Sequence, residues 1–324
     1  MDQIKKLNGG ASNEVYQIND TMLLRVFGAN SNVLVNQENE RHIMNELGKK
    51  GISPKILLEF KGGRLEEFIK DSRSLTFNDL TCNSLIFFNL IGKIKEVHNA
   101  QINLNGSDGW IKLINNLKDK AIEINPDRKK EHEWERNWQL NNIKEKYTTT
   151  PILIENIEKW TEEAKKINPN FYKVYMLKDS ILEKLKQVKS LGIVLCHNDL
   201  QKNNILVNKD TFDVKLIDFE YSGYNFIEFD IANFLCELQI DYTEDCFEFH
   251  DCNVNDMKNI TKLICNIYTE SEEKSLQLFN NLELFTMAAH YMWIIWAIIK
   301  SANKSSFDYI EYANKRMKIL EKHI

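Results

Sequence analysis

The sequence predicts a bilobal α+β fold, with a small β-rich N-terminal lobe at residues 1–69 and a larger, mainly helical C-terminal lobe at residues 70–324. Three observations predict this fold. The first seventy residues alternate short apolar runs with turn residues, which is typical of strands. Most of the remainder carries apolar residues at helical spacing. Within that helical part, apolar runs flank one polar loop that is rich in Asp and Asn. A chain of 324 residues can bury a sizeable core, in one large domain or in two lobes.

The N-terminal lobe is expected to contain strands around a single helix. Apolar and β-branched residues favour the strands, and turn residues at 19–20 and 61–63 separate them in pairs. In the helix, Ile43, Met44 and Leu47 recur at helical spacing. The predicted elements are, in order, strands at residues 14–18 and 22–27, a helix at 36–49, and strands at 55–60 and 64–69.

The C-terminal lobe is expected to be helical apart from short strands beside the polar loop. Residues 85–98 carry apolar side chains at helical spacing and predict one helix. Residues 285–299 are the most apolar stretch, but they are too few for a comfortable membrane span and include His290, so we expect a buried helix. The charge-dense residues 118–147 are expected to form a solvated surface helix or an insertion. The short strands are predicted at residues 193–195, 205–207 and 214–217.

Composition narrows the class of protein. The apolar fraction is 43% and the charged fraction 27%, which is ordinary for a globular chain. A net charge of −5 carries no basic signal for nucleic acid, so we expect no nucleic-acid partner. The six cysteines form no C-x-x-C pair, which disfavours a zinc site. Residues 1–6 contain no apolar signal core, so we expect a cytoplasmic protein with reduced thiols.

The polar loop carries the strongest chemical signal. It reads Cys-His-Asn-Asp-Leu-Gln-Lys-Asn-Asn-Ile-Leu over residues 196–206, and Leu-Ile-Asp-Phe-Glu-Tyr follows at 216–221. Asp199, Asn204 and Asp218 stand at the spacing that phosphoryl transfer uses in kinase-like enzymes. There the first Asp accepts the proton of the substrate hydroxyl, and the Asn and second Asp hold Mg²⁺. Asp and Asn are also common in ordinary turns. The complete motif between apolar strands favours catalysis by Asp199, Asn204 and Asp218.

Two features of the N-terminal lobe could serve the phosphates of a nucleotide. A glycine pair before a strand lets the backbone approach a phosphate, although such a pair also marks ordinary turns. The predicted phosphate loop consists of Gly9, Gly10, Ala11, Ser12 and Asn13. Arg25 stands between apolar residues on a predicted strand and could contact the phosphates as a strand lysine does in kinases, or it could be a surface residue. Glu40 on the predicted helix could pair with Arg25, and Glu38 competes for that role.

The surroundings of the loop disfavour a protein substrate. The residue before Asp199 is Asn198, where protein kinases carry the Arg that gathers a phosphorylated activation loop. Only eleven residues separate Asp218 from Asp230, which is too few for a long activation segment. A small-molecule substrate fits better.

Aromatic residues near the C-terminus could hold a cation. Trp293 and Trp296 are three apart on a predicted helix, so both indoles face one side. Aromatic faces with a nearby carboxylate are the natural way to hold a quaternary ammonium, which has no N–H to donate. The alternative is a stripe of aromatic residues that packs in the core. The candidate residues are Tyr221, Tyr242, Trp293, Trp296 and Tyr312, with Glu237 and Glu220 as carboxylates.

Seven segments together resemble the choline/ethanolamine kinase family, which has the bilobal protein-kinase-like fold shared with aminoglycoside phosphotransferases. The block at 217–237, I-D-F-E-Y-S-G-Y-N-x-x-x-F-D-I-A-N-F-x-C-E, is long and distinctive of this family, whereas residues 110–190 match only loosely. The other segments are G-G-A-S-N at 9–13, L-L-R-V-F-G at 23–28, G-R-L-E-E-F-I at 63–69, C-H-N-D-L-Q-x-x-N-I-L at 196–206, H-Y-M-W-I-I-W at 290–296 and F-D-Y-I-E-Y-A at 307–313.

The resemblance implies ATP-dependent phosphorylation of choline to phosphocholine, the first step of phosphatidylcholine synthesis by the CDP-choline route. Gln201 in H-N-D-L-Q resembles choline kinases, whereas ethanolamine kinases often carry Leu there. An ethanolamine or dual kinase is the alternative, followed by an aminoglycoside-type phosphotransferase and a non-catalytic pseudokinase. The implied cofactors are ATP and Mg²⁺, the implied partner is a small amino-alcohol, and the family often forms homodimers.

The resemblance also implies roles for individual residues. Asp230 would brace the backbone of the catalytic loop, and His197 would pack and hydrogen-bond without transferring protons. Gln201 would lie near the reacting phosphate, and Glu220 could contribute to a second metal. The adenine hinge would be lined by Gly63, Arg64, Leu65 and Glu66, and the amino-alcohol would be bound by Glu237, Tyr242, Trp293, Trp296 and Tyr312.

Overall fold

The computed structural model describes residues 4–7, 13–27, 34–102, 104, 150–243, 245–250 and 252–324, and Asn13 by its backbone alone. Gly9, Gly10, Ala11 and Ser12 of the predicted phosphate loop lie outside the described residues. The charged segment 118–147 lies outside them as well.

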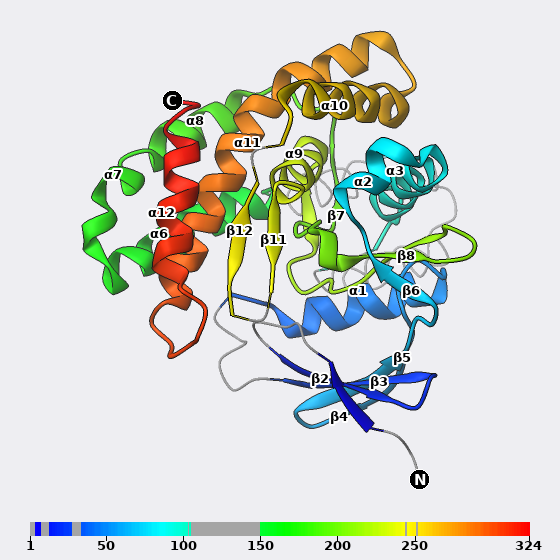
Figure 1. Ribbon diagram of the computed structural model, residues 1–324. Coiled ribbons are helices and arrows are strands. Elements are labelled where there is room, and N and C mark those ends of the chain that lie inside the picture. The colour runs from blue at the N-terminus through cyan, green and yellow to red at the C-terminus, as the bar shows by residue number, and fades with distance from the viewer. Residues whose placement is uncertain are drawn as a thin grey trace, which may run out of the picture.

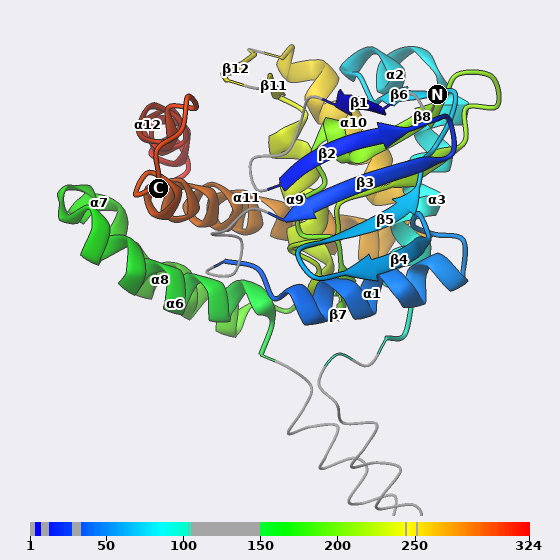
Figure 2. The same cartoon turned by 90° about the horizontal axis from the view of Figure 1, so that it is seen from below.

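The N-terminal lobe is built on an antiparallel sheet with the strand order β1-β2-β3-β5-β4. Its five strands are β1 (Ile4–Leu7), β2 (Asn13–Ile18), β3 (Met22–Phe27), β4 (Ile56–Phe60) and β5 (Gly63–Glu67). The expected strands are confirmed, and β1 is an addition. Figure 2 shows β2, β3, β5 and β4 side by side in that order.

Helix α1 (Gln37–Lys49) lies between this sheet and the rest of the molecule (Figure 1). It begins at Asn36, whose side chain accepts the backbone N–H of Asn39, as an N-cap residue does. Ile43, Met44 and Leu47 are buried on one face, so the predicted helix and its apolar stripe are confirmed.

The C-terminal lobe contains the other α-helices in the part of the chain that the structure describes. They are α2 (Phe77–Cys82), α3 (Ser84–His98), α6 (Ile152–Ile167), α7 (Tyr172–Tyr175), α8 (Lys178–Gln187), α9 (Ile227–Glu237), α10 (Val254–Thr269), α11 (Glu272–Lys300) and α12 (Tyr309–Leu320). Helix α11 packs against α6, α9 and α12 and is the central helix of the lobe. Its length and hydropathy would suit a membrane span, but 78% of its most apolar window is buried inside the protein. The expected buried helix at residues 285–299 is therefore confirmed as part of α11.

Three small sheets frame the predicted catalytic loop. β6 (Ser72–Ser74), β8 (Ile205–Asn208) and β9 (Val214–Leu216) form one, and β7 (Ile193–Cys196) pairs with β10 (Gly223–Phe226) in another. β11 (Ile240–Tyr242) and β12 (Phe247–Phe249) form a hairpin. The expected strands β7, β8 and β9 are confirmed, whereas β6, β10 and the hairpin were not expected. The chain from β7 to β8 carries the loop, and Asp218 follows β9.

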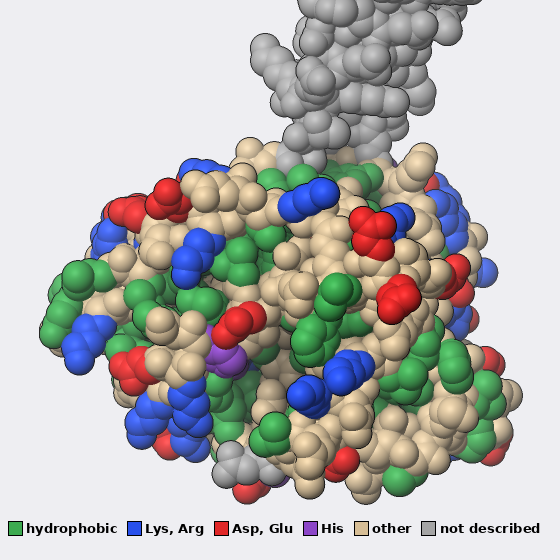
Figure 3. Space-filling view, turned by 90° about the horizontal axis from the view of Figure 1, so that it is seen from above, with side chains coloured by type: hydrophobic (Ala, Val, Ile, Leu, Met, Phe, Trp, Pro, Cys, Tyr) green, Lys and Arg blue, Asp and Glu red, His purple; other side chains and the backbone are tan. Residues whose placement is uncertain are grey.

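The two lobes join through the short connection between β5 and β6, at residues 68–71. The predicted boundary between residues 69 and 70 lies within this connection. On the molecular face in Figure 3, lysine and arginine side chains are interspersed with aspartate and glutamate.

Candidate active site

The loop between β7 and β8 holds Asp199 and Asn204 against each other. The side-chain Nδ2 of Asn204 donates to the carbonyl oxygen of Asp199 at 2.9 Å and to its Oδ2 at 3.0 Å. Gln201 Nε2 donates to the same Oδ2 at 3.4 Å. Burial, with the nearby charges of Glu237 and Asp218, raises the pKa of Asp199 to about 8. The carboxylate is thus oriented by an amide and sits among other acidic groups.

Asp230, in the first turn of α9, braces the backbone of this loop. Its Oδ2 accepts the N–H of His197 at 2.9 Å, and its Oδ1 accepts the N–H of Asn198 at 2.7 Å. Asn198 has a φ of 66°, a left-handed conformation that Asn tolerates better than most residues. The predicted bracing role of Asp230 is confirmed.

His98 on α3 completes the support of Asp230. Its Nε2–H donates to Asp230 Oδ2 at 2.9 Å, and its Nδ1 pairs with the hydroxyl of Tyr268 at 2.7 Å. The side chains of His98, Cys196 and Asp230 lie close enough to hold a metal ion. Each of them already has protein hydrogen-bond partners, so we interpret the cluster as structural.

His197 packs in the interior, as predicted. It is fully buried, and its ring lies 4.6 Å from that of Phe219 between centroids. Its Nε2–H donates to the carbonyl of Ile217 at 2.9 Å, which leaves Nδ1 to accept the N–H of Asp199 at 3.3 Å. Burial lowers the pKa of His197, so the ring is a neutral spacer between the loop and β9.

Asp218 and Glu220 bring two more carboxylates to the loop. Asp218, two residues after the end of β9, takes a left-handed φ of 65°. Burial, followed by the charges of Asp218 and Glu40, raises the pKa of Glu220 to about 8. Asn204 uses its amide nitrogen toward Asp199, which leaves its carbonyl oxygen as the atom that could ligate a cation. Oxygen donors of this kind suit Mg²⁺, and a divalent cation would offset the mutual repulsion of the carboxylates.

Arg25 on β3 connects the N-terminal sheet to this acidic group. Its Nη1 donates to Asp218 Oδ1 at 3.2 Å and its Nε to Glu66 Oε1 at 3.0 Å. Burial opposes the charge of Arg25, but the neighbouring carboxylates of Asp218 and Glu66 outweigh it and raise its pKa. Arg25 is therefore an oriented, buried cation beside the predicted metal ligands and not a surface residue.

The predicted pairing of Glu40 with Arg25 is wrong. Glu40 on α1 accepts from Arg64 Nη2 at 2.7 Å, and Arg64 Nε donates to Glu66 at 2.6 Å. Arg25 and Arg64 are directly opposite each other in the β3–β5 register, so both guanidinium groups lie on one face of the sheet. Glu66 bridges the two, and α1 approaches the face at Arg64. Glu38, the competing candidate, is exposed.

The segment expected to line the adenine hinge forms β5, between β3 and β4 in the sheet. Arg64 and Glu66 are buried in the ion pairs described above. Gly63 leaves no room for a side chain, because a Cβ there would lie 2.4 Å from the carbonyl oxygen of Arg25. Leu65 is opposite Leu24 on the other face of the sheet. Contact of this segment with adenine stays a prediction.

The predicted aromatic residues gather where α11, α12 and β11 meet. Trp293 and Trp296 lie edge-to-face with centroids 5.4 Å apart, and Trp296 lies 6.3 Å from Tyr312. Trp296 Nε1 donates to the hydroxyl of Tyr221 at 2.9 Å, and Trp293 Nε1 donates to Asn233 at 2.7 Å. The structure thus brings the predicted aromatic residues together in one cluster.

A cation already approaches this cluster. The Nζ of Lys300, at the end of α11, lies 5.6 Å from the centroid of the Trp296 ring, which is within the range of a cation–π contact.

Glu237 at the end of α9 is committed to a buried ion pair. Arg316 on α12 donates from Nη2 to Glu237 Oε1, and Tyr242 donates from its hydroxyl to Glu237 Oε2 at 2.7 Å. The hydroxyl of Tyr312 lies 2.9 Å from that of Tyr242. Glu237 therefore lies beside the aromatic cluster but does not present an uncompensated charge, and its contact with a substrate stays a prediction.

Sequence reasoning missed Arg316 and several members of the aromatic cluster. Arg316 follows Tyr312 by one helical turn, and that spacing was the available signal. The hairpin β11–β12 had only the Phe-x-Phe alternation at residues 247–249. The additional aromatic neighbours of Tyr312 and Trp296 are Phe247, Phe249, Phe307 and Tyr309.

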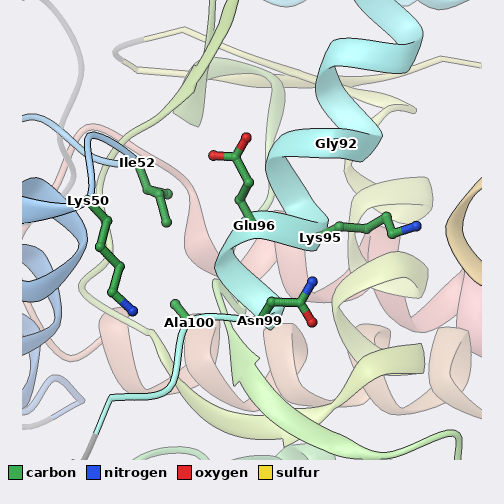
Figure 4. Close-up of a pocket in the computed structure, with 7 residues that line it drawn as sticks. All are labelled: Lys50, Ile52, Gly92, Lys95, Glu96, Asn99 and Ala100. Carbon is green, nitrogen blue, oxygen red and sulfur yellow. The ribbon is translucent and has the colours of Figure 1, made fainter.

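A separate pocket of about 590 Å³ lies between the end of α1 and α3. Figure 4 shows Lys50 and Ile52 on one side of it and the α3 residues Lys95 and Glu96 on the other. No residue of the predicted site lines this pocket, so it is distinct from the catalytic group.

Comparisons with known proteins show which family the chain resembles. The family model for choline/ethanolamine kinases matches residues 4–321. The chain is 28% identical to a probable choline kinase of Arabidopsis thaliana, over 98% of this chain and 85% of that protein. It is 26% identical to a probable ethanolamine kinase of Dictyostelium discoideum, over 98% of this chain and 86% of that protein. The structure of a choline kinase from Cryptosporidium parvum superposes with a TM-score of 0.73 at 22% identity, over 99% of this chain and 88% of that one.

Proposed function

We propose that this chain, which belongs to the choline/ethanolamine kinase family, transfers the γ-phosphate of ATP to the hydroxyl group of choline. Membership of the family makes the chain a kinase that acts on an alcohol and uses ATP. Choline as the particular substrate, and phosphocholine production for phosphatidylcholine in the cytoplasm, are the proposal. The known relatives include both choline and ethanolamine kinases.

The observation that carries the choice of choline is the aromatic cluster, which we propose as the wall of the amino-alcohol pocket. Trp293, Trp296 and Tyr312 lie together beside a carboxylate, Glu237, that Arg316 neutralises. A trimethylammonium group has no N–H and binds aromatic faces. A primary ammonium group needs hydrogen-bond acceptors, and both carboxylate oxygens of Glu237 already accept from the protein. The pocket therefore suits choline better than ethanolamine.

The proposed reaction begins at Asp199. Its carboxylate accepts the proton of the choline hydroxyl, the hydroxyl oxygen bonds to the γ-phosphorus, and the bond from that phosphorus to the leaving oxygen of ADP breaks. Asn204 and Gln201 hold the carboxylate in place through Oδ2. Asp230 holds the backbone of the loop. Because little covalent chemistry is required of the protein, catalysis rests on this positioning and on charge stabilisation.

The residues that would hold Mg²⁺ are Asn204 and Asp218, with Glu220 beside them. The cation, when bound, would neutralise charge on the phosphate oxygens. Arg25 is the cation of the N-terminal lobe next to this group, because it contacts Asp218 directly. We propose that Arg25 contacts the phosphates of ATP from the sheet side.

The proposal is tested by ADP release in a coupled assay, with choline, ethanolamine and an aminoglycoside compared side by side through kcat/KM. We expect the highest kcat/KM for choline. A higher kcat/KM for ethanolamine would identify ethanolamine as the preferred substrate in place of choline. ATP binding without turnover of any of the three alcohols would contradict kinase activity.

The role of Asp199 is tested in the same assay. Asp199→Asn preserves the shape of the side chain and removes the proton acceptor, so we expect a loss of kcat of about 10²-fold or more. Asp210→Asn changes an exposed aspartate in the turn after β8 and is the matched control. Full turnover by the Asp199→Asn variant would rule out Asp199 as the base.

A further inference from the structure

Arg316 is the least expected residue in the pocket, because it brings a full positive charge to a site that should bind a cation. Its side chain is completely buried. Removing a guanidinium group from water is costly unless it is paired, so a buried Arg requires a specific partner. Glu237 is that partner, and its own side chain is also buried. Neither charge reaches solvent.

The guanidinium group also contacts the tyrosine side chains of the pocket. Nη2 donates to the hydroxyl of Tyr242 at 3.3 Å, and the group stacks 4.8 Å from the centroid of the Tyr312 ring. Since Tyr242 donates its own hydroxyl proton to Glu237, the hydroxyl of Tyr312 donates to Tyr242. The planar guanidinium group is suited to such simultaneous pairing and stacking.

Arg316 joins four separate elements in this way. It lies on α12, Glu237 ends α9, Tyr242 ends β11, and His290 on α11 faces Arg316 Nη1 at 3.3 Å. These elements carry the residues of the aromatic cluster, so the contacts of Arg316 hold the elements together at that cluster.

We propose that Arg316 neutralises Glu237 and fixes Tyr242 and Tyr312, so that the pocket recognises an ammonium group by its aromatic faces and not by the charge of Glu237. The inference rests on the proposed function, because it concerns the amino-alcohol of the same site. It makes Arg316 a positioning and specificity residue that favours methylated ammonium groups over primary ones.

The rival explanation is that Glu237 acts as the counter-ion of the substrate despite its ion pair. The two explanations predict different effects of substitution on one measurable quantity. That quantity is the preference of the site for choline over 3,3-dimethylbutan-1-ol. This alcohol has the shape of choline without its charge, so the ratio of the two dissociation constants reports the effect of substrate charge.

The experiment is a double-mutant cycle on the full-length protein, with both dissociation constants measured by titration calorimetry. Glu237→Gln leaves the Arg316 charge unopposed and should lower the preference for choline by about threefold or more. Arg316→Met leaves the carboxylate unopposed and should raise it by a similar factor. In the double variant no charge remains at either position, and the preference should return to within about twofold of the wild-type value.

The double variant decides between the explanations. If its preference for choline is as low as that of Glu237→Gln, Glu237 is the counter-ion and the inference is overturned. The double variant replaces a buried ion pair with neutral side chains and is expected to fold even where Arg316→Met alone does not. Trp296→Leu is the positive control, because losing one aromatic face should lower the preference by about fivefold.

A structural role alone would not raise this ratio in Arg316→Met, because looser walls weaken the binding of both ligands and displace the aromatic faces. The wild-type measurement tests the proposed function separately. A wild-type protein that neither prefers choline over its neutral analogue nor phosphorylates it would contradict the proposed substrate, and the same cycle with ethanolamine would then still test Arg316.

Discussion

Asp230→Asn is the most informative single substitution, because Asp230 supports the catalytic loop without belonging to it. The native carboxylate accepts three hydrogen bonds, from His98 Nε2 and from the backbone N–H groups of His197 and Asn198. An amide at this position keeps one acceptor oxygen and presents an NH₂ group where the second oxygen was. If the oxygen stays with His197 and His98, the N–H of Asn198 loses its acceptor inside the protein.

The expected magnitude follows from that lost contact. A hydrogen bond to a charged group contributes about 1.5–3 kcal/mol, and an orphaned buried donor costs about 1–3 kcal/mol. We therefore expect Asp230→Asn to lower the free energy of unfolding by about 2–3 kcal/mol. Asp230→Ala removes all three bonds and should lower it by about 4–5 kcal/mol. Because the affected backbone leads directly into Asp199, kcat should fall as well.

The pH dependence has a definite sign. Burial opposes the ionised form of Asp230, but the hydrogen bonds from the His98 side chain and the His197 backbone outweigh it, so its pKa lies below the usual value. A carboxylate with a depressed folded-state pKa stabilises the fold above its unfolded pKa and loses that contribution as the pH falls through the folded pKa. The stability difference between wild type and Asp230→Asn should therefore be constant from about pH 7 to about pH 5 and shrink below about pH 4.

Urea unfolding and steady-state kinetics at several pH values provide the measurement. Asp210→Asn, at an exposed position, is the control and should change the unfolding free energy by less than about 0.5 kcal/mol. If Asp230→Asn unfolds within about 0.5 kcal/mol of wild type and keeps its kcat, the loop does not depend on Asp230 and the reasoning is refuted.

Three further outcomes are expected. Gly63→Ala should destabilise the fold by about 1–3 kcal/mol in thermal unfolding, because its Cβ would meet a carbonyl of the neighbouring strand at 2.4 Å. Gly92→Ala, on a helix with nothing within 4 Å, should instead be neutral or stabilising. Glu40→Gln should lower the free energy of unfolding by about 1–3 kcal/mol, because it weakens the buried ion pair with Arg64. Glu38→Gln, at an exposed position, should change that free energy little. Equal effects of the two substitutions would contradict the pairing of Glu40 with Arg64. Trp296→Phe should raise the KM for choline by about threefold or more with a smaller change in kcat, and an unchanged KM would place choline elsewhere.

The contacts within the candidate catalytic loop could be predicted, because they join residues that lie close together in the sequence. Asp199 and Asn204 lie five residues apart, and a short loop between two strands brings such residues together whatever surrounds it. The elements with strong periodicity could be predicted for the same reason. Helix α1 and strands β2 and β3 follow from apolar spacing that repeats within one element. The apolar residues at 285–299 predicted a buried helix because no charged residue interrupts them.

The pairing of side chains from different elements could not be predicted. Glu40 meets Arg64 and not Arg25, because the register of β3 against β5 places the two arginines opposite each other and α1 approaches the sheet at Arg64. The spacing of residues along the chain does not reveal how β3 and β5 are aligned. The hairpin β11–β12 was missed because each of its strands has only three residues, which is too short for an alternation signal.

By itself, the sequence determined the order of most elements, the loop with Asp199, Asn204 and Asp218, and the kind of reaction, since all of these depend on residues close together in the chain. Only the tertiary structure decided which charges meet. Arg316 and Glu237 are seventy-nine positions apart, and their pairing follows from the packing of α12 against the end of α9. A buried charge takes its partner from whatever the fold places within about 4 Å, and that neighbourhood is a property of packed helices and strands and not of the linear chain.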